Sequence, residues 1–235
     1  MHWGHRVVSV LAIVSLWFHI LWEKPDDNKR NIVRLSVITG GFVSNWIARL
    51  IVVVSNSWKY QHRCSVVVLH GAVRIKIPLV LGSSFELSPG QYIYIMIPTI
   101  SLEMHRFYIC WVDPQNIWLL VQPHAPESFT GQLARITHQT PVFVEGAYGP
   151  MTSNLGSYGT VMFIASGIRI APILGCMKWL RKQHIQRKVV TQRISLIWEI
   201  EHDTHLDWVR DWVNQLLFED VTRVGEAYSM QGLKC

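Results

Sequence analysis

The segment VMFIASGIRIAP, from Val161 to Pro172, has the residue types to bind a dinucleotide phosphate. Its apolar run predicts a buried strand, and small residues then lead through a tight turn into a helical pattern. In such a turn, backbone N–H groups approach the phosphates and the helix N-terminus adds about half a positive charge. Arg169 stands where a second glycine is expected.

Arg169 leaves two interpretations of this turn. If the position needs a positive φ or a close backbone approach, a long side chain strains the turn and obstructs the phosphate. Alternatively, the guanidinium pairs with a phosphate oxygen. We expect obstruction, because such a turn acts through its backbone.

Two histidines form a second group, since His5 and His19 lie 14 residues apart in an apolar segment. At about 1.5 Å and 100° per residue, that spacing places both imidazoles on one helix face, roughly 21 Å apart. Ionisable residues inside a membrane helix are functional candidates. The alternative is that His5 lies too near the N-terminus to be embedded and that His19 sits at the membrane interface.

Two apolar segments predict the membrane helices that would carry these histidines. Val7–Trp22 has no formal charge over 16 residues, and Leu35–Val54 has only a few polar residues and Arg49. Each is close to the roughly 20 residues that span a bilayer. A signal peptide is the alternative for the first, but neither a basic n-region nor a small-residue cleavage site accompanies it. Basic residues after the second helix predict that the C-terminal part is cytosolic: Lys59, His62, Arg63, Arg74 and Lys76.

The composition of the 235 residues fits a protein with a membrane portion. Hydrophobic residues make up 49% of the chain and charged residues 16%, which is rich for a soluble protein. The net charge of +6 comes from scattered residues and no nucleic-acid motif is present, so nucleic acid is not an expected partner. The four cysteines lie far apart and form neither a CxxC pair nor a disulfide framework, which indicates a reducing compartment.

Two patterns follow the apolar segments. From Ser65, short alternating runs with Gly and Pro between them predict the strands of an antiparallel barrel or sandwich. After Gly159, a continuous apolar run, a helix from about 170 to 184, the strand RISLIWEI and an amphipathic helix in HLDWVRDWVNQLL predict a β-α-β-α unit with a parallel sheet.

Five motifs in this order carry a resemblance to a known family: PGQYIYIMIP, HRFYICW, VEGAYGP, IASGIRIAP and LIWEIE. The chain resembles the ferric reductase and NADPH oxidase family, and most of all the fungal-type ferric-chelate reductases. The resemblance implies two transmembrane helices that end a haem domain (1–58). It also implies a ferredoxin-NADP-reductase-like module, with an FAD-binding antiparallel β-barrel (59–152) and a partial NAD(P)-binding α/β domain (153–235).

The resemblance also implies which residues bind cofactors. His105, Arg106, Phe107 and Tyr108 correspond to the family's His-Pro-Phe-Thr segment, with Arg106 for Pro and Tyr108 for Thr, and would hold FAD together with Thr130 in a Ser-Phe-Thr segment. The alternative for Phe107 and Tyr108 is that they are ordinary strand residues that pack on the core. Expected at the NADPH site are Gly146, Tyr148, Gly149, Ser166, Gly167, Ile168 and Arg169, of which the first three could instead form a plain interdomain turn. His5 and His19 would each ligate the iron of one haem b, and each iron would need a second histidine from another helix.

The implied function is electron transfer across a membrane, from NADPH through FAD and haem to a ferric chelate, as in iron uptake. No protein nucleophile or acid–base pair is expected. The membrane would be the plasma membrane, crossed more than once, with lipid as a partner. The missing haem-ligand helices, expected on the N-terminal side, would come from a full-length chain or another copy. The family also continues past the end of this sequence with further strands. The alternatives are a truncated chain that binds at most FAD, and a superoxide-producing oxidase.

Overall fold

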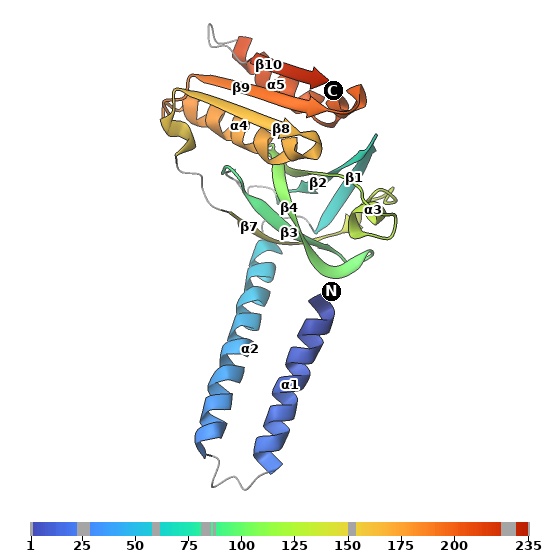
Figure 1. Cartoon of the computed structure of the whole chain (residues 1–235), viewed down its shortest axis with the longest axis vertical. Helices are drawn as coiled ribbons and strands as arrows, with labels where there is room; N and C mark the ends of the chain where they lie inside the picture. Colours follow the sequence, from blue (N-terminus) through green and yellow to red (C-terminus); the bar gives the residue numbers. More distant parts are fainter. Residues whose placement is uncertain are drawn as a thin grey trace. The chain divides into compact units, whose positions relative to one another are not determined.

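The computed structural model describes residues 2–22, 29–57, 62–80, 86, 88–149, 154–221 and 229–234 (Figure 1). The chain divides into two compact units, Met1–Val52 and Val53–Cys235. The second unit contains both of the patterns predicted after the apolar segments.

The first unit is built from helices α1 (His2–Trp22) and α2 (Lys29–Ser57). Trp17 Nε1 of α1 donates a hydrogen bond to Thr39 Oγ1 of α2, 3.0 Å away. In α2, the segment Lys29–Val52 is 24 residues long and apolar enough to cross a membrane, whereas the apolar segment of α1, Val7–Trp22, is shorter. Both helices are confirmed as helices, and a membrane crossing by α1 stays a prediction.

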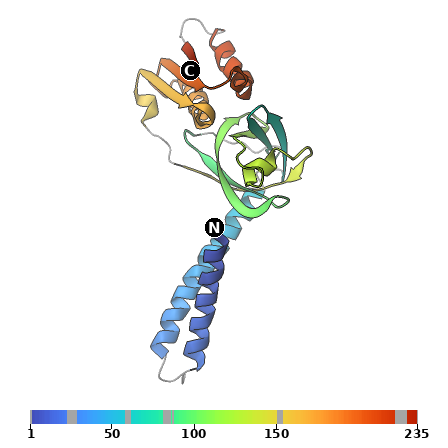
Figure 2. The same ribbon diagram turned by 45° about the vertical axis from the view of Figure 1, so that its right-hand side comes forward.

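The second unit begins with a curled antiparallel sheet (Figure 2). Its strands are β1 (Arg63–Leu69), β2 (Ala72–Pro78), β3 (Tyr92–Ile97), β4 (Ser101–Val112), β5 (Asn116–Val121), β6 (Thr140–Pro141) and β7 (Phe143–Tyr148), in the order β6-β1-β2-β5-β4-β3-β7. The edge strands β6 and β7 follow each other in the chain, so residues 140–148 contact both edges and the sheet takes a barrel-like shape. The short helix α3 (Phe129–Leu133) lies between β5 and β6 in the chain.

Side chains with a period of two fill the interior of this sheet. Ile75 and Ile77 of β2 and Ile93, Ile95 and Ile97 of β3 are fully buried, and they pack into one cluster with Phe129 and Leu133 of α3. This alternation is the pattern from which the barrel was predicted, and the antiparallel pairing confirms it.

The rest of the second unit is a three-stranded parallel sheet with two helices on one face (Figure 1). After the 3-10 turn η1 (Leu155–Ser157) come β8 (Thr160–Ser166), the 3-10 turn η2 (Gly167–Arg169), α4 (Ile170–Ile185), β9 (Arg193–Ile200), the 3-10 helix η3 (Asp203–Trp208), α5 (Arg210–Val221) and β10 (Ser229–Lys234). The strand order is β10-β9-β8. Leu174 of α4 and Leu216 of α5 pack with Leu196 and Trp198 of β9.

Two features of this region differ from the prediction. The single helix expected within residues 205–217 is divided into η3 and α5. Val209 between them has φ −138° and ψ −1°, which is outside helical geometry. The carbonyls of Asp207 and Trp208 accept hydrogen bonds from Arg74 instead of serving a continuous helix. The predicted β-α-β-α unit also continues into a third parallel strand, β10.

Candidate functional site

The predicted phosphate turn has the expected strand–turn–helix geometry. β8 ends at Ser166 in an extended conformation (φ −129°, ψ 132°), Gly167 follows with φ +50°, and α4 begins three residues later. Glycine suits this position because L side chains rarely adopt positive φ. A Cβ on Gly167 would have no atom within 4 Å, so the turn is open on that side.

The expectation that Arg169 strains the backbone of this turn is wrong. Arg169 has φ −67° and ψ −5°, a conformation open to every L-residue, and its side chain is exposed. The reason is that the positive φ of this turn falls two residues earlier, at Gly167. The arginine therefore replaces a glycine without cost to the backbone.

The four residues expected to hold FAD lie on two faces of β4, because side chains alternate along a strand. Tyr108 pairs with Tyr92 of β3 and Arg106 pairs with Tyr94, which places all four side chains on one face. The guanidinium of Arg106 lies 5.2 Å from the Tyr92 ring centroid and 5.9 Å from that of Tyr108. These distances are within the range of a cation–π contact.

Four aromatic residues form a tyrosine cluster on this face: Tyr92, Tyr94, Tyr108 and Tyr148. Ring centroids of neighbouring members are 5.8–6.1 Å apart, and Tyr148 donates a hydrogen bond to Glu145 Oε1 at 3.0 Å. Tyr108 is 41% exposed. Exposed aromatic rings beside a guanidinium offer a stacking surface for a planar ring and a charge for a phosphate. These residues therefore fit a flavin nucleotide.

His105 and Phe107 lie on the opposite face of β4. The His105 ring stacks on Phe129 of α3 with centroids 3.9 Å apart, and the Phe107 ring lies 6.0 Å from the same phenylalanine. Burial lowers the pKa of His105, against a smaller opposing effect of Glu103, so the imidazole is neutral at pH 7. Its buried Nε2 has no hydrogen-bond partner within the described part of the chain.

Thr130 lies next to Phe129 in α3. Its Oγ1 accepts a hydrogen bond from the backbone N–H of His124 at 3.1 Å and lies 3.2 Å from Ser128 Oγ. Ser128 caps the helix by accepting a hydrogen bond from Gly131 N at 3.1 Å. The Thr130 hydroxyl therefore orders the loop before α3.

Three residues expected at the NADPH site lie in or just after β7, in the barrel sheet. Tyr148 belongs to the tyrosine cluster. Gly149 has φ +122°, and a Cβ there would lie 2.8 Å from the carbonyl oxygen of Gly90, so only glycine fits. Gly146, Tyr148 and Gly149 thus accompany the flavin candidates, whereas Ser166, Gly167, Ile168 and Arg169 form the turn between β8 and α4.

The two expected haem ligands, His5 and His19, both lie on α1. His19 is exposed on α1, and the side chain of His5 lies outside the described residues, although the helix backbone includes it. In the described ranges, no group of three or more His, Cys, Asp or Glu residues could hold a metal ion. His5 and His19 as haem ligands therefore stay a prediction.

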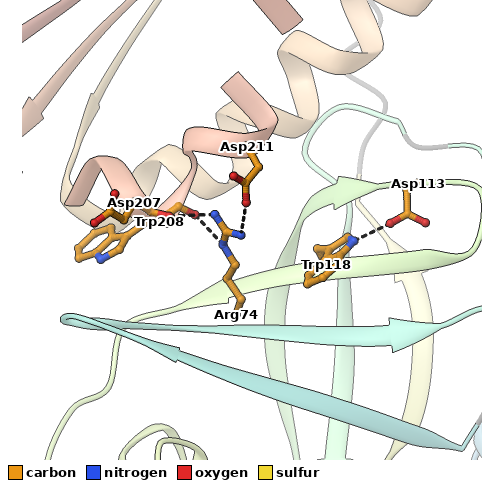
Figure 3. A network of polar contacts seen from close by, with 6 residues as sticks. All are labelled: Arg74, Asp113, Trp118, Asp207, Trp208 and Asp211. Carbon is orange, nitrogen blue, oxygen red and sulfur yellow. Dashed lines mark hydrogen bonds and ion pairs between the residues drawn. The ribbon is translucent and has the colours of Figure 1, made fainter. Parts of the chain in front are cut away.

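A polar junction fastens the region of η3 and α5 to the barrel, and sequence reasoning did not find it (Figure 3). Arg74 of β2, 9% exposed, donates from Nε to Trp208 O, from Nη2 to Asp207 O and from Nη1 to Asp211 Oδ2, each at 2.9 Å. The guanidinium also lies 4.3 Å from the Trp212 ring centroid. Trp208 Nε1 returns a hydrogen bond to the His70 carbonyl at 2.6 Å.

α4 makes a second junction with the barrel. Lys178 donates a hydrogen bond to the Val112 carbonyl at the end of β4, and its ammonium lies 3.8 Å from the Trp111 ring centroid. Lys182 forms an ion pair with Glu86 at 2.8 Å. The helix that follows the phosphate turn is thereby fixed to β4, the strand that carries the flavin candidates.

Comparison with known proteins agrees with this organisation. Residues 158–227 match a family described as the ferric reductase NAD binding domain. The chain is 23% identical over 228 residues to a probable cell surface ferric reductase, kap2, of Aspergillus oryzae, covering 89% of this chain and 26% of the relative. It is 24% identical over 248 residues to ferric/cupric reductase transmembrane component 7 of Saccharomyces cerevisiae, covering 97% and 37%. With NADPH oxidase 1 of Mus musculus, the identity is 27% over 140 residues, covering 56% and 24%.

Solved structures show the same fold for most of the chain. The cytochrome P450 reductase GcoB of Amycolatopsis superposes with a TM-score of 0.54 and 13% identity, covering 74% of this chain and 50% of that one. The CS-b5R domains of human Ncb5or superpose with a TM-score of 0.54 and 16% identity, covering 74% and 51%. The likeness establishes a ferredoxin-reductase-like module.

The chain spans between about a quarter and somewhat over a third of the length of these curated relatives. Ferric reductases match 89–97% of it, and NADPH oxidases match 54–72%. The family description, the relatives and the fold together support an assignment of the chain to the ferric reductase and NADPH oxidase family.

Proposed function

We propose that the chain is the C-proximal part of a multi-pass membrane reductase that passes electrons from NADPH through FAD towards haem b and a ferric chelate. The observation that carries the proposal is the joint presence of an open Gly167 turn at the head of α4 and of the tyrosine cluster with Arg106 on the barrel. A dinucleotide donor and a flavin each have a candidate surface in one unit. Bound FAD would accept a hydride and release electrons one at a time.

The protein's own residues would bind and orient the flavin. The tyrosine cluster offers ring faces for stacking, and Arg106 offers a charge-assisted hydrogen bond to a phosphate. On the other face of β4, the unpartnered Nε2 of His105 is a further polar group that a flavin phosphate or hydroxyl could satisfy. Burial of an unpaired polar atom costs about 1–3 kcal/mol, and that cost would be offset on binding.

The dinucleotide would bind at the N-terminus of α4. There the helix dipole favours an anion. In the first turn of α4, the Ile170 N–H already bonds to Gly167 O and Pro172 has no N–H, so the backbone donors left for a phosphate would be the N–H groups of Ile168 and Ala171. Arg169, which is exposed and unstrained beside them, would pair with a phosphate. The junctions of Arg74 and Lys178 would keep this turn at a fixed distance from the flavin surface.

The membrane part would anchor the module with its C-terminal side in the cytosol. The 24-residue segment of α2 and the basic residues after it support this orientation. One helix supplies at most one imidazole per haem, so the second ligands would come from other helices of a longer chain or from another copy. Within the described ranges, no group of residues forms a metal site of this kind.

A ferric chelate is preferred over oxygen as acceptor because ferric reductases match 89% and 97% of this chain, compared with 54–72% for NADPH oxidases. The test is to purify the full chain in lipid nanodiscs with FAD and haem, supply NADPH, and measure ferrous iron and superoxide in parallel. Formation of ferrous iron insensitive to superoxide dismutase supports the proposal. Superoxide as the main product would favour the oxidase, and a chain that binds FAD but reduces neither would favour the non-catalytic alternative.

A further inference from the structure

Trp198 contacts the phosphate turn from the interior of the protein. It lies in β9 opposite Ala165 of β8, and it is only 3% exposed. Its indole Nε1 donates a hydrogen bond to the carbonyl oxygen of Gly167 at 2.9 Å. Buried tryptophans require an acceptor for this N–H, and here the acceptor belongs to the turn rather than to a strand.

The hydrogen bond fixes the orientation of one peptide unit. The C=O of Gly167 and the N–H of Ile168 belong to the same planar trans peptide, so they point in opposite directions. Because the carbonyl is turned towards the buried indole, the Ile168 N–H is turned away from that indole. The same carbonyl also accepts the backbone N–H of Ile170, which ties the peptide to the first turn of α4.

Without the indole, the Gly167 carbonyl would keep the Ile170 N–H as a donor but would lose its hydrogen bond to the protein interior. Gly167 adopts φ +50°, and glycine has many alternative conformations of similar energy. Rotation of the peptide by half a turn would present the carbonyl oxygen, instead of the N–H, to an incoming phosphate. A backbone anion site needs fixed N–H groups, and preorganisation of this kind reduces the cost of binding.

We propose that Trp198 is a positioning residue for dinucleotide binding, which holds the Gly167 carbonyl inward so that the Ile168 N–H faces the phosphate. The inference rests on the proposed function, because it assigns a role within the same site. Trp198 does not touch the dinucleotide and acts through the peptide between Gly167 and Ile168.

The test compares two tryptophan substitutions in the full chain in nanodiscs. Trp198→Phe keeps a large ring but removes the donor. Trp118→Phe is the matched control, since Trp118 Nε1 also donates one hydrogen bond, to Asp113 Oδ2 at 2.7 Å (Figure 3), but lies in the barrel. The dissociation constant of NADPH is measured by calorimetry. Loss of one hydrogen bond predicts about five- to tenfold weaker binding for Trp198→Phe, and an unchanged constant for Trp118→Phe.

Two further measurements separate positioning from loss of structure. Replacement of Trp198 by benzothienylalanine, which keeps the ring shape but has sulfur in place of N–H, should weaken NADPH binding as much as phenylalanine does. With FAD bound, Trp198→Phe should raise KM for NADPH and leave kcat at saturation unchanged. Equal binding by wild type and the analogue overturns the proposal, as does equal weakening by both phenylalanine variants. If the wild type itself binds no NADPH, both the proposed function and the role of Trp198 are overturned.

Discussion

Arg169 shows what a motif can and cannot predict about a single residue. The strand, the turn and the small residues Ser166 and Gly167 were predicted from the sequence alone. The strain was not, because the backbone conformation of each turn residue is set by how β8 and α4 meet, and the motif does not say which residue takes the positive φ. With φ −67° at Arg169, a role for the guanidinium in phosphate binding becomes the better expectation.

Substitution of Arg169 tests that role directly. Arg169→Gly and Arg169→Ala should weaken NADPH binding to the same extent, because both residues adopt φ −67° without strain. Loss of a charge-assisted contact of about 1.5–3 kcal/mol corresponds to roughly ten- to a hundredfold in affinity. The difference from wild type should shrink as salt is added. Tighter binding by Arg169→Gly than by wild type in a calorimetric titration would contradict this assignment.

His205 predicts a dependence of stability on pH. Its ring is 7% exposed, stacks on Trp208 at 3.9 Å, and has an Nδ1 with no partner in the part of the chain described. Its pKa is lowered, first by burial and then by His202 and His70, while Glu201 opposes the shift. Unfolded histidine titrates near pH 6.5, so the unfolded state takes up the proton first. Stability is therefore complete above about pH 6.5 and falls below it.

The measurement is the rate of amide hydrogen exchange in η3 at pH 7.5 and pH 5.5, corrected for intrinsic exchange. Wild type should open more readily at the lower pH, and His205→Gln should show a smaller pH dependence. His138→Gln, at an exposed position, serves as the control and should behave as wild type. An identical pH dependence in His205→Gln and wild type would refute the role of His205.

Among the elements, the parallel strands were the most predictable. β8 and β9 have the residues that the apolar runs TVMFIAS and RISLIWEI indicated, since continuous apolar runs are typical of parallel strands. In β8, however, only one face is covered, and Met162 and Ile164 are exposed. The alternating strands β2, β3 and β5 were also recognised. Because side chains alternate along a strand, the sequence alone also predicts that His105 and Tyr108 lie on opposite faces of β4. The four residues expected to hold FAD could therefore have been assigned to two different surfaces before the structure was known.

The elements that were missed depend on contacts distant in sequence. The helix break at Val209 arises where Arg74, more than 130 residues earlier, takes the carbonyls of Asp207 and Trp208. The strand β10 contains Gly232 and polar residues, and only its pairing with β9 makes it a strand. Local patterns carry no signal for either feature.

Arg74→Lys tests the junction that η3 and α5 make with the barrel. An ammonium cannot supply donors to two carbonyls in the fixed geometry of a guanidinium or stack in the same way on Trp212. We expect amide exchange in η3 and α5 to accelerate about ten- to a hundredfold, from loss of hydrogen bonds worth about 1.5–3 kcal/mol. Most of this comes from the carbonyls, because Asp211 is exposed to solvent, which screens the ion pair.

The matched control for this variant is Arg210→Lys. Arg210 forms an ion pair with Asp207 at 2.8 Å, with both side chains more than half exposed. Such pairs contribute about 0–1 kcal/mol, so exchange should change by less than about fivefold. Similar exchange in Arg74→Lys and Arg210→Lys would show that the buried guanidinium does not hold the junction.

For the whole molecule, the apolar surface of the first unit predicts membrane anchoring. Many large apolar side chains of α1 and α2 are exposed, among them Val8, Leu11, Val37, Ile38 and Trp46, far more than a soluble protein exposes in one area. In sealed vesicles with the cytosolic face outward, added protease should digest residues from 62 onward and spare α2. Protection of the module under these conditions would contradict the cytosolic assignment.

The module and the membrane unit differ in whether this chain supplies all the residues that their proposed sites need. The nucleotide and flavin surfaces are built from residues within one unit, whereas haem ligation would require histidines beyond those described. The electron acceptor, a ferric chelate or oxygen, cannot be identified from sequence patterns either, since ferric reductases and oxidases share the motifs on which the family resemblance rests. Transfer of electrons within the module is therefore the central claim.

Reduction of bound flavin by a dinucleotide tests that claim most directly. The full chain in nanodiscs is loaded with FAD, freed of oxygen and mixed with NADPH, and the visible absorbance of oxidised flavin is followed. The account predicts that FAD binds, that NADPH bleaches its absorbance, and that Trp198→Phe needs a higher NADPH concentration to reach the same rate. Flavin that binds but is not bleached at saturating NADPH, or a folded chain that binds no flavin, would contradict it.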